Sequence, residues 1–308
     1  MEFTEVVSGL RFPEGPIAYP DGSVVLVEIE RGTLSRVTTN GKIEVIADLG
    51  GGPNGAAVGP DGKIYICNSG GMSFSKKDGL ILPLGHSPDY SGGRIEQVDP
   101  KTGAAKVLYR SCDGVPLRAP NDIVFDRQGG FYFTDHGTIG HRERDRTGIF
   151  YAKTDGKFIS EIVFPMDMPN GIGLSPDESV LYVAESSSGR LWAFDLEAPG
   201  KVKPPSGPMG GFFTGRCIAG LPGLQMFDSL AVDAEGNVCV ATLINGGITS
   251  ISPDGSKIEF YPTPDFLTTN ICFGGKDMKD AYITLSSQGK LVKCRWPRAG
   301  LKLNFLNT

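Results

Sequence analysis

Short apolar runs alternate with polar and turn-forming residues along the chain, and this pattern repeats. Six segments begin with a polar residue, continue as a short apolar strand and close with a turn at a constant offset: residues 14–22, 54–62, 121–129, 170–178, 228–236 and 270–278. A second apolar run follows each turn, so every segment predicts a β-hairpin. The polar first residues are called head residues below; they are Glu14, Asn54, Asn121, Asn170, Asp228 and Asn270.

The period of the repeat predicts the fold class. Head residues recur roughly every 50 residues, and further strand pairs fill the intervals, as is typical of propeller blades. We therefore expect an all-β chain: a six-bladed β-propeller with four antiparallel strands per blade, formed as a single domain by residues 1–308. Residues 3–7 are expected to supply the outer strand of the last blade, which closes the ring and removes an exposed edge.

The strand order predicts which end of the propeller each connection occupies. If the head residues lie at the top, the connections between second and third strands also lie at the top. Two of the longest connections, residues 69–91 and 136–146, fall in this class, whereas the insertion 198–210 should lie at the opposite end. Because long loops in a compact domain are usually functional, the top is the expected functional face.

Composition and charge restrict the classes of partner. The 43 glycines and 22 prolines fit many short strands and tight turns, and the net charge of -5 argues against a nucleic-acid partner. The six cysteines form no CxxC pair, which favours a reducing compartment over a disulfide framework. The first ten residues do not resemble a signal peptide, and no run is long enough to cross a bilayer. We expect a soluble cytoplasmic protein with no membrane partner.

The head residues are candidate metal ligands. The innermost strands of a propeller line its channel, so two carboxylates and four amides should converge near the axis. Such hard oxygen donors suit Ca²⁺ best, with Mg²⁺, Mn²⁺ or Zn²⁺ as alternatives. The other interpretation is that each head is only a turn residue that begins an inner strand. Six polar heads in register, two of them acidic, favour one divalent ion at the top of the central channel.

Several short motifs carry a resemblance to a known family. They are residues 12–16 (FPEGP), 120–122 (PND), 169–171 (PNG), 228–236 (DSLAVDAEG) and 269–277 (TNICFGGKD). Together they resemble the regucalcin/gluconolactonase/luciferin-regenerating-enzyme family over nearly the whole chain. The resemblance implies a six-bladed propeller with one divalent metal held by Glu14, Asn121, Asn170 and Asp228. Ser229 follows the last of these, where the family usually has glycine, and is expected to reshape the site slightly.

The resemblance also implies a reaction. Family members hydrolyse sugar lactones and other cyclic esters, and one branch hydrolyses organophosphates. The metal would polarise a lactone carbonyl while water attacks, with Asp228 as the candidate general base. A metal-bound hydroxide without a protein base is the alternative mechanism. A phosphotriester or fluorophosphate hydrolase at the same metal, and a non-enzymatic binding module, are the alternative functions.

Further residues are predicted to contact a small lactone substrate. Arg118 corresponds to the family's arginine near the Asn-Asp motif, and Asn54 and Asn270 are the two heads outside the ligand set. His136 follows a predicted second strand directly and either contacts substrate or is an exposed loop histidine.

The connection 69–91 is unusually apolar, with Phe74, Ile81 and Tyr90 among its residues. It predicts either a lid over a partly apolar substrate or a homo-oligomer contact. The sequence does not distinguish between an aldonolactone and another lactone as the substrate.

Overall fold

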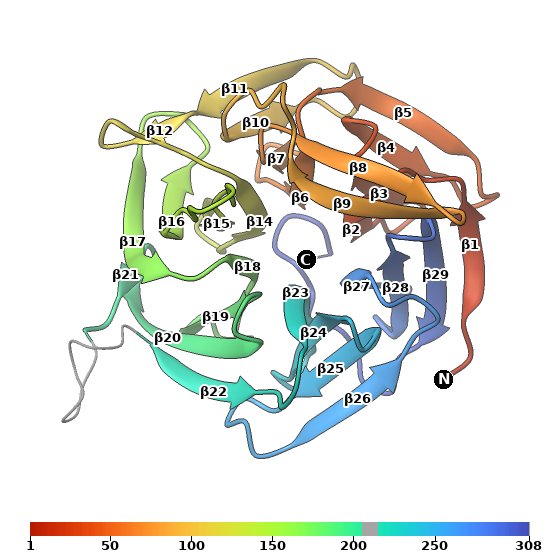
Figure 1. The fold of residues 1–308 in the computed structure, drawn as a ribbon. Helices are drawn as coiled ribbons and strands as arrows, with labels where there is room; N and C mark the ends of the chain where they lie inside the picture. The colour runs from red at the N-terminus through yellow and green to blue at the C-terminus, as the bar shows by residue number, and fades with distance from the viewer. Residues whose placement is uncertain (205–214, 308) are drawn as a thin grey trace.

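The computed structural model describes residues 1–204 and 215–307, and every regular element within them is a β-strand. Six antiparallel sheets of four or five strands surround a central channel, as Figure 1 shows down the channel axis. The predicted six-bladed β-propeller is therefore confirmed.

The first three blades follow the chain in order from the channel outward. The first contains β2 (Pro13–Ala18), β3 (Val24–Glu28), β4 (Thr33–Val37) and β5 (Ile43–Asp48). The second contains β6 (Pro53–Val58), β7 (Ile64–Asn68), β10 (Arg94–Val98) and β11 (Ala105–Tyr109). The third contains β14 (Pro120–Phe125), β15 (Gly130–Asp135), β16 (Thr147–Lys153) and β17 (Ile159–Met166).

The remaining blades follow the same plan. The fourth contains β18 (Pro169–Leu174), β19 (Val180–Glu185), β20 (Arg190–Ala198) and β22 (Arg216–Gly220), with β21 (Lys201–Val202) also paired to β20. The fifth contains β23 (Met226–Val232), β24 (Val238–Leu243), β25 (Gly247–Ile251) and β26 (Ile258–Pro262). The sixth contains β27 (Thr268–Gly274), β28 (Asp280–Leu285), β29 (Lys290–Arg295) and β1 (Thr4–Ser8). Two separate hairpins pair β8 (Met72–Lys77) with β9 (Leu80–His86) and β12 (Ser111–Cys112) with β13 (Val115–Pro116).

The N-terminal strand closes the ring in the sixth blade. β1 pairs antiparallel with β29, with Thr4 opposite Lys293 and Ser8 opposite Lys290. The N-terminal strand thus covers the outer edge of a blade whose other strands come from the C-terminal part of the chain. This confirms the predicted closure, which leaves no unpaired edge at the junction.

The hydrophobic core is a ring of clusters, each formed mainly where two neighbouring blades pack together. Between the second and third blades, for example, the rings of Tyr65 and Phe131 lie 5.6 Å apart and neither side chain is exposed. Burying a large apolar side chain stabilises a fold by about 1.5–3 kcal/mol. Because every blade shares its core with both neighbours, the inner strands are held at fixed positions around the channel.

The connections lie at the predicted ends of the propeller. The connection 69–91 forms the β8–β9 hairpin, which lies across the first blade in Figure 1. At the opposite end, the backbone of Gly200 donates to the hydroxyl of Tyr132, whereas residues 205–210 of the predicted insertion lie outside the described residues. β22, the strand that follows this insertion, begins at Arg216.

A C-terminal segment, residues 300–307, lies at the end of the channel opposite the head residues. Gly300 forms a β-bridge with Asp233, and the amide of Leu301 donates to the carbonyl of Val232 at 3.0 Å. The ring of Phe305 packs on Phe125 at 6.0 Å between centroids. In Figure 1 the C-terminus accordingly lies at the centre of the ring.

The sequence predicted no disulfide framework and no membrane-spanning segment. All six cysteines are free, and five of them are buried. Nowhere in residues 1–204 and 215–307 does the chain form a helix with the length and hydropathy of a membrane span.

Candidate metal centre at the top of the channel

The head residues all lie near the start of an inner strand, at the same end of the channel. At each of them the register between the inner strand and the second strand shifts, as between Glu14 and Ile17 in the first blade. Such a bulge bends the strand and re-aims a side chain. The repeat found in the sequence therefore corresponds to a repeated bulge, which turns polar side chains into a channel otherwise lined by apolar strands.

Five head residues line one cavity of about 300 Å³ at the top of the channel: Glu14, Asn54, Asn121, Asn170 and Asp228. The sixth, Asn270, lines a second cavity of about 290 Å³ on the side of the C-terminal segment. Asn270 still contacts the upper group, because its Nδ2 donates to Oε2 of Glu14 at 2.7 Å. The structure thus brings the predicted ligands together, with Asn270 behind them.

Two oxygen atoms at this site are buried without a hydrogen-bond partner. Glu14 is 2% exposed; its Oε2 accepts from Asn270 and from the amide of Gly15, while its Oε1 has no partner. Oδ1 of Asn121 is likewise buried and unpaired. Leaving a buried polar atom unsatisfied costs about 1–3 kcal/mol. Two such acceptors at one end of the channel require a donor or a cation to satisfy them.

The charge at the site points to a cation. Burial raises the pKa of Glu14 to about 6, and burial together with the neighbouring Glu14 carboxylate raises the pKa of Asp228 well above its ordinary value. Of the described residues that line the upper cavity, none is a lysine or an arginine. The two carboxylates therefore have no positive side chain at the site to compensate them, and a bound divalent ion would do so.

Asn170 is oriented by two neighbouring hydroxyl groups. Its Nδ2 donates to Oγ of Ser186 at 3.1 Å, and its Oδ1 accepts from Oγ of Ser229 at 3.4 Å. The serine that replaces the family's usual glycine therefore contacts the neighbouring candidate ligand. Gly171 then allows the fourth and fifth blades to approach, since a Cβ atom there would lie 2.7 Å from the carbonyl oxygen of Asp228.

The donor set fits a hard divalent cation. Carboxylate and amide oxygens are ligands that Ca²⁺ and Mg²⁺ accept, and zinc would normally add histidine or cysteine. In the part of the chain that the structure describes, no group of three or more His, Cys, Asp or Glu side chains is arranged to hold a metal ion. The candidate site is of a different kind, because half of its four donors are amides.

The other predicted substrate contacts lie in different places. His136 lines the upper cavity, and burial lowers the pKa of its imidazole, which keeps it neutral near pH 7. Arg118 is not among the residues that line the cavity; its Nε pairs with Oδ2 of Asp145 at 2.9 Å, and its side chain is 42% exposed. The substrate-binding roles of both residues stay predictions.

The β8–β9 hairpin forms one wall of the upper cavity through Met72, Pro83 and His86. It is fixed to its own propeller, because Phe74 packs on Phe12 with 5.0 Å between ring centroids and the Ile81 amide donates to the Ser287 carbonyl at 2.8 Å. This inward face supports the interpretation as a cover. The homo-oligomer contact stays a prediction.

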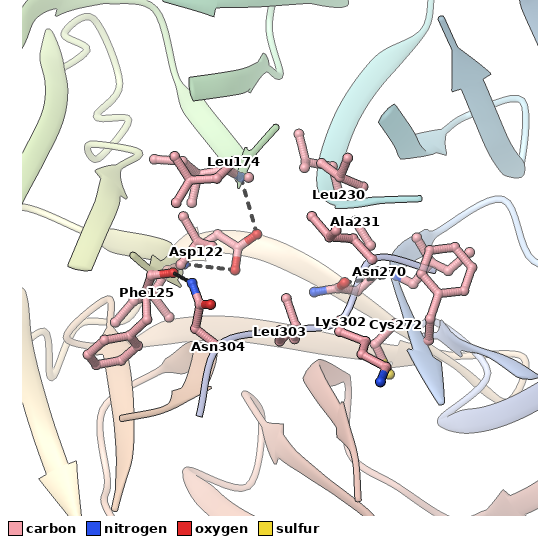
Figure 2. A pocket seen from close by; sticks show the side chains of 18 of the residues that line it. Asp122, Phe125, Leu174, Leu230, Ala231, Asn270, Cys272, Lys302, Leu303 and Asn304 are labelled. Atoms are coloured by element: carbon pink, nitrogen blue, oxygen red, sulfur yellow. Dashed lines mark hydrogen bonds between the residues drawn. The ribbon is translucent and has the colours of Figure 1, made fainter. Parts of the chain in front are cut away.

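Sequence reasoning missed Asp122, which lies in the bulge directly after Asn121. Its side chain points into the lower cavity, where Oδ1 accepts from the amide of Ile123 at 2.9 Å and Oδ2 from that of Ile172 at 3.4 Å (Figure 2). Burial and the charge of Glu14 raise the pKa of Asp122 to about 8. An acid in the position after a head residue, where the other repeats have glycine, serine or isoleucine, was the available signal.

The lower cavity and its cover were also missed. Figure 2 shows Lys302, Leu303 and Asn304 of the C-terminal segment below the inner strands. Nδ2 of Asn304 donates to the carbonyl of Phe125 at 3.1 Å, which ties the segment to the third blade. Chain ends are hard to place from sequence because their contacts are all remote along the chain.

The fold and the polar group at one end of its channel define a class, the six-bladed propellers with a candidate metal centre at the channel mouth. A family model described as SMP-30/Gluconolactonase/LRE-like region matches residues 12–287, and the chain belongs to this family. The gluconolactonase of Zymomonas mobilis is 28% identical, over 94% of this chain and 80% of that protein. Lactonase drp35 of Staphylococcus saprophyticus is 27% identical, over 77% of this chain and 65% of that protein.

Solved structures share the fold. A gluconolactonase from Xanthomonas campestris superposes with a TM-score of 0.74 at 21% identity, over 96% of this chain and 89% of that one. The calcium-binding protein regucalcin from Agrobacterium tumefaciens gives a TM-score of 0.72 at 19% identity, over 97% and 94%. At these identities the likeness extends to the fold alone.

Proposed function

We propose that this protein is a metal-dependent hydrolase that opens lactones. One observation carries the proposal: two carboxylates, those of the buried Glu14 and the partly buried Asp228, meet two amides at the top of the channel, and Oε1 of Glu14 and Oδ1 of Asn121 have no partner there. A propeller that served only as a binding module would have no need of two acids without a compensating positive charge at this position. The names of the related gluconolactonase and lactonase support a lactone as the substrate.

Glu14, Asn121, Asn170 and Asp228 would hold the metal ion. Ca²⁺ is the first choice because it accepts amide and carboxylate oxygens in an irregular shell, and the calcium-binding regucalcin supports it. Mg²⁺, Mn²⁺ and Zn²⁺ are the alternatives. When bound, the ion supplies a positive charge that polarises the lactone carbonyl and stabilises the oxyanion of the transition state.

Asp228 is the proposed general base. Its carboxylate accepts a proton from the attacking water, whose oxygen forms a bond to the carbonyl carbon while the ring C–O bond breaks. The proton then returns to the ring oxygen that leaves, and the product is a hydroxy acid. Burial and the neighbouring Glu14 raise the pKa of Asp228 when no cation is bound. A bound cation would favour the ionised carboxylate, which is the form that can accept a proton.

The remaining polar groups of the cavity bind and orient the substrate. Asn54 and His136 line the cavity beside the candidate ligands, and the neutral imidazole of His136 can both donate and accept a hydrogen bond. Asn270 does not contact the substrate; it orients the Glu14 carboxylate through a hydrogen bond.

A pH-stat screen tests the proposal. The purified protein is assayed for acid release from aliphatic and sugar lactones, before and after chelation and after Ca²⁺ is added back, with a phosphotriester in the same panel. We expect hydrolysis of at least one lactone, its loss on chelation and its return with Ca²⁺. Hydrolysis of the phosphotriester alone, or lactone hydrolysis indifferent to chelation, would contradict the proposal.

A further inference from the structure

The walls of the upper cavity are apolar once the head residues are set aside. The lining residues Phe12, Ile29, Met168, Met226, Leu243 and Leu267 come from or adjoin the first, fourth, fifth and sixth blades. Met72 and Pro83 of the β8–β9 hairpin complete the apolar lining. The candidate metal ligands therefore lie at the floor of a small hydrophobic chamber.

Most hydroxyl groups in the lining already have partners within the protein. Oγ of Ser186 donates to the Phe227 carbonyl at 2.7 Å, and Oγ1 of Thr138 donates to Asp145 at 2.6 Å. Oγ of Ser69 donates to the Gly52 carbonyl at 3.0 Å. Apart from the candidate metal ligands, few polar side chains are left for a substrate, chiefly Asn54, His86 and His136.

A sugar lactone would be poorly matched to this chamber. Its ring carries several hydroxyl groups, and each one buried without a partner weakens binding. An alkyl substituent needs no partners and is favoured by the same walls. The hydrogen-bonding capacity near the metal site is enough for the ester group of a lactone and for little else.

The hairpin makes the hydrophobic wall a fixed part of the molecule. Phe12, Ile29, Ile81 and Leu267 form a buried cluster that joins the hairpin to the propeller, with Phe74 packed against it. A salt bridge of 3.0 Å between Lys76 and Glu30 adds a contact at the rim. Because the hairpin is anchored on the first and sixth blades, its apolar lining residues face the cavity instead of solvent.

We propose that this enzyme selects lactones whose ring bears an alkyl substituent over polyhydroxylated sugar lactones, a specificity set by the apolar walls and the β8–β9 hairpin. This inference rests on the proposed lactone hydrolysis. The ester group lies at the head residues, and the alkyl chain lies between the fifth-blade wall of Met226 and Leu243 and the hairpin.

A chain-length series tests the specificity. The calcium-supplied protein is assayed on δ-valerolactone, δ-hexalactone, δ-octalactone, δ-decalactone and glucono-δ-lactone, with the spontaneous rate subtracted. We expect kcat/KM to rise about threefold per added methylene until the cavity is filled, and glucono-δ-lactone to fall below δ-valerolactone. A flat series, or glucono-δ-lactone as the best substrate, overturns this inference and leaves the proposed function standing. Hydrolysis of none of the five overturns both.

A matched pair of variants tests whether the apolar wall at Leu243 determines the preference for alkyl-substituted lactones. Leu243→Gln places an amide in the wall, whereas Leu224→Gln changes a leucine that is 78% exposed and outside the cavity. We expect the ratio of kcat/KM for δ-decalactone over δ-valerolactone to fall about tenfold in Leu243→Gln and to stay unchanged in Leu224→Gln. Thermal melts establish that both variants are folded. An unchanged ratio in folded Leu243→Gln would show that this wall does not select the substrate.

Discussion

The amide of Asn270 in the sixth blade donates a hydrogen bond to the carboxylate of Glu14 in the first blade, with 2.7 Å between Nδ2 and Oε2. The contact joins two inner strands from opposite ends of the chain across the junction where the ring closes. It holds one oxygen of Glu14 and leaves the other, Oε1, without a partner in the upper cavity. Asn270 is thus a positioning residue for a candidate metal ligand.

Replacing Asn270 by alanine should weaken the metal site. A partner that orients a ligand typically contributes about 10- to 100-fold to metal affinity, and Asn270→Ala removes that partner from Glu14. Calcium titration by calorimetry on chelated protein measures the change. Asn245→Ala, at an exposed position that does not line the upper cavity, is the control. Equal calcium affinity in Asn270→Ala and the control would show that the contact does not position the ligand.

Replacing Asp228 by asparagine separates ligation from proton transfer. The amide oxygen can still coordinate a cation but cannot take a proton from water, so kcat should fall by about 10²- to 10⁴-fold. Calcium titration should show that the variant still binds the ion. Asp89→Asn, at an exposed position of the connection 69–91, serves as the charge-matched control. Turnover close to that of the unmodified enzyme would mean that Asp228 is not the base.

Gly171 lets the fourth and fifth blades approach at the site. A Cβ atom there would lie 2.6 Å from the amide nitrogen of Leu230 and 2.7 Å from the carbonyl oxygen of Asp228. Both atoms belong to backbone, so Gly171→Ala should destabilise the protein by about 1–3 kcal/mol. Gly220→Ala is the matched control, since its Cβ would meet only Cγ of Arg190 at 3.6 Å. Denaturant unfolding of both variants checks the difference, and equal stability would contradict it.

Stability should depend on pH through Asp177. Hydrogen bonds from Ser175 and Ser179 lower the pKa of Asp177 to about 2, so the folded state binds fewer protons here than the unfolded state. The stabilisation is therefore complete above the ordinary pKa of an aspartate and is lost as the pH falls towards 2. Because the side chain is exposed and solvent weakens its contacts, Asp177→Asn should cost about 1 kcal/mol or less at pH 7.

Denaturant unfolding of the wild type and Asp177→Asn between pH 7 and pH 3 checks this prediction. The difference in the free energy of unfolding should shrink as the pH falls below 4, because the unfolded wild type then binds a proton that the folded state still excludes. A difference that stayed constant over the whole range would assign the effect to something other than the charge of Asp177.

Most of the fold could be predicted from the sequence because the pattern of head residue, apolar run and turn occurs six times. Head residues such as Glu14 and Asn121 recur in register with their turns, and this register predicted the six inner strands and the end of the channel that they share. The pairing of β1 with β29 was predictable because a closed ring needs a final strand. These features follow from local patterns that occur six times.

What the sequence could not supply depends on contacts that do not repeat. The connection 69–91 has an apolar composition, but its β8–β9 pairing and its anchor on Ser287 depend on a blade more than two hundred residues away. The role of Asn270 required knowing which face of its strand meets Glu14. The position of the C-terminal segment depends on contacts that are remote along the chain, such as that of Asn304 with Phe125. The sequence marks Asp122 as unusual, but the direction of its side chain depends on the bulge in its strand.

The central claim is that lactone hydrolysis requires one divalent ion held by the head residues, and a calcium titration of the reaction rate tests it most directly. Chelated protein is titrated with Ca²⁺ while bound ion and the rate of δ-valerolactone hydrolysis are measured on the same samples. We predict that the rate falls to the uncatalysed level without the ion and returns in parallel with the binding of one ion per chain. Full hydrolysis by protein that holds no divalent ion would contradict the claim.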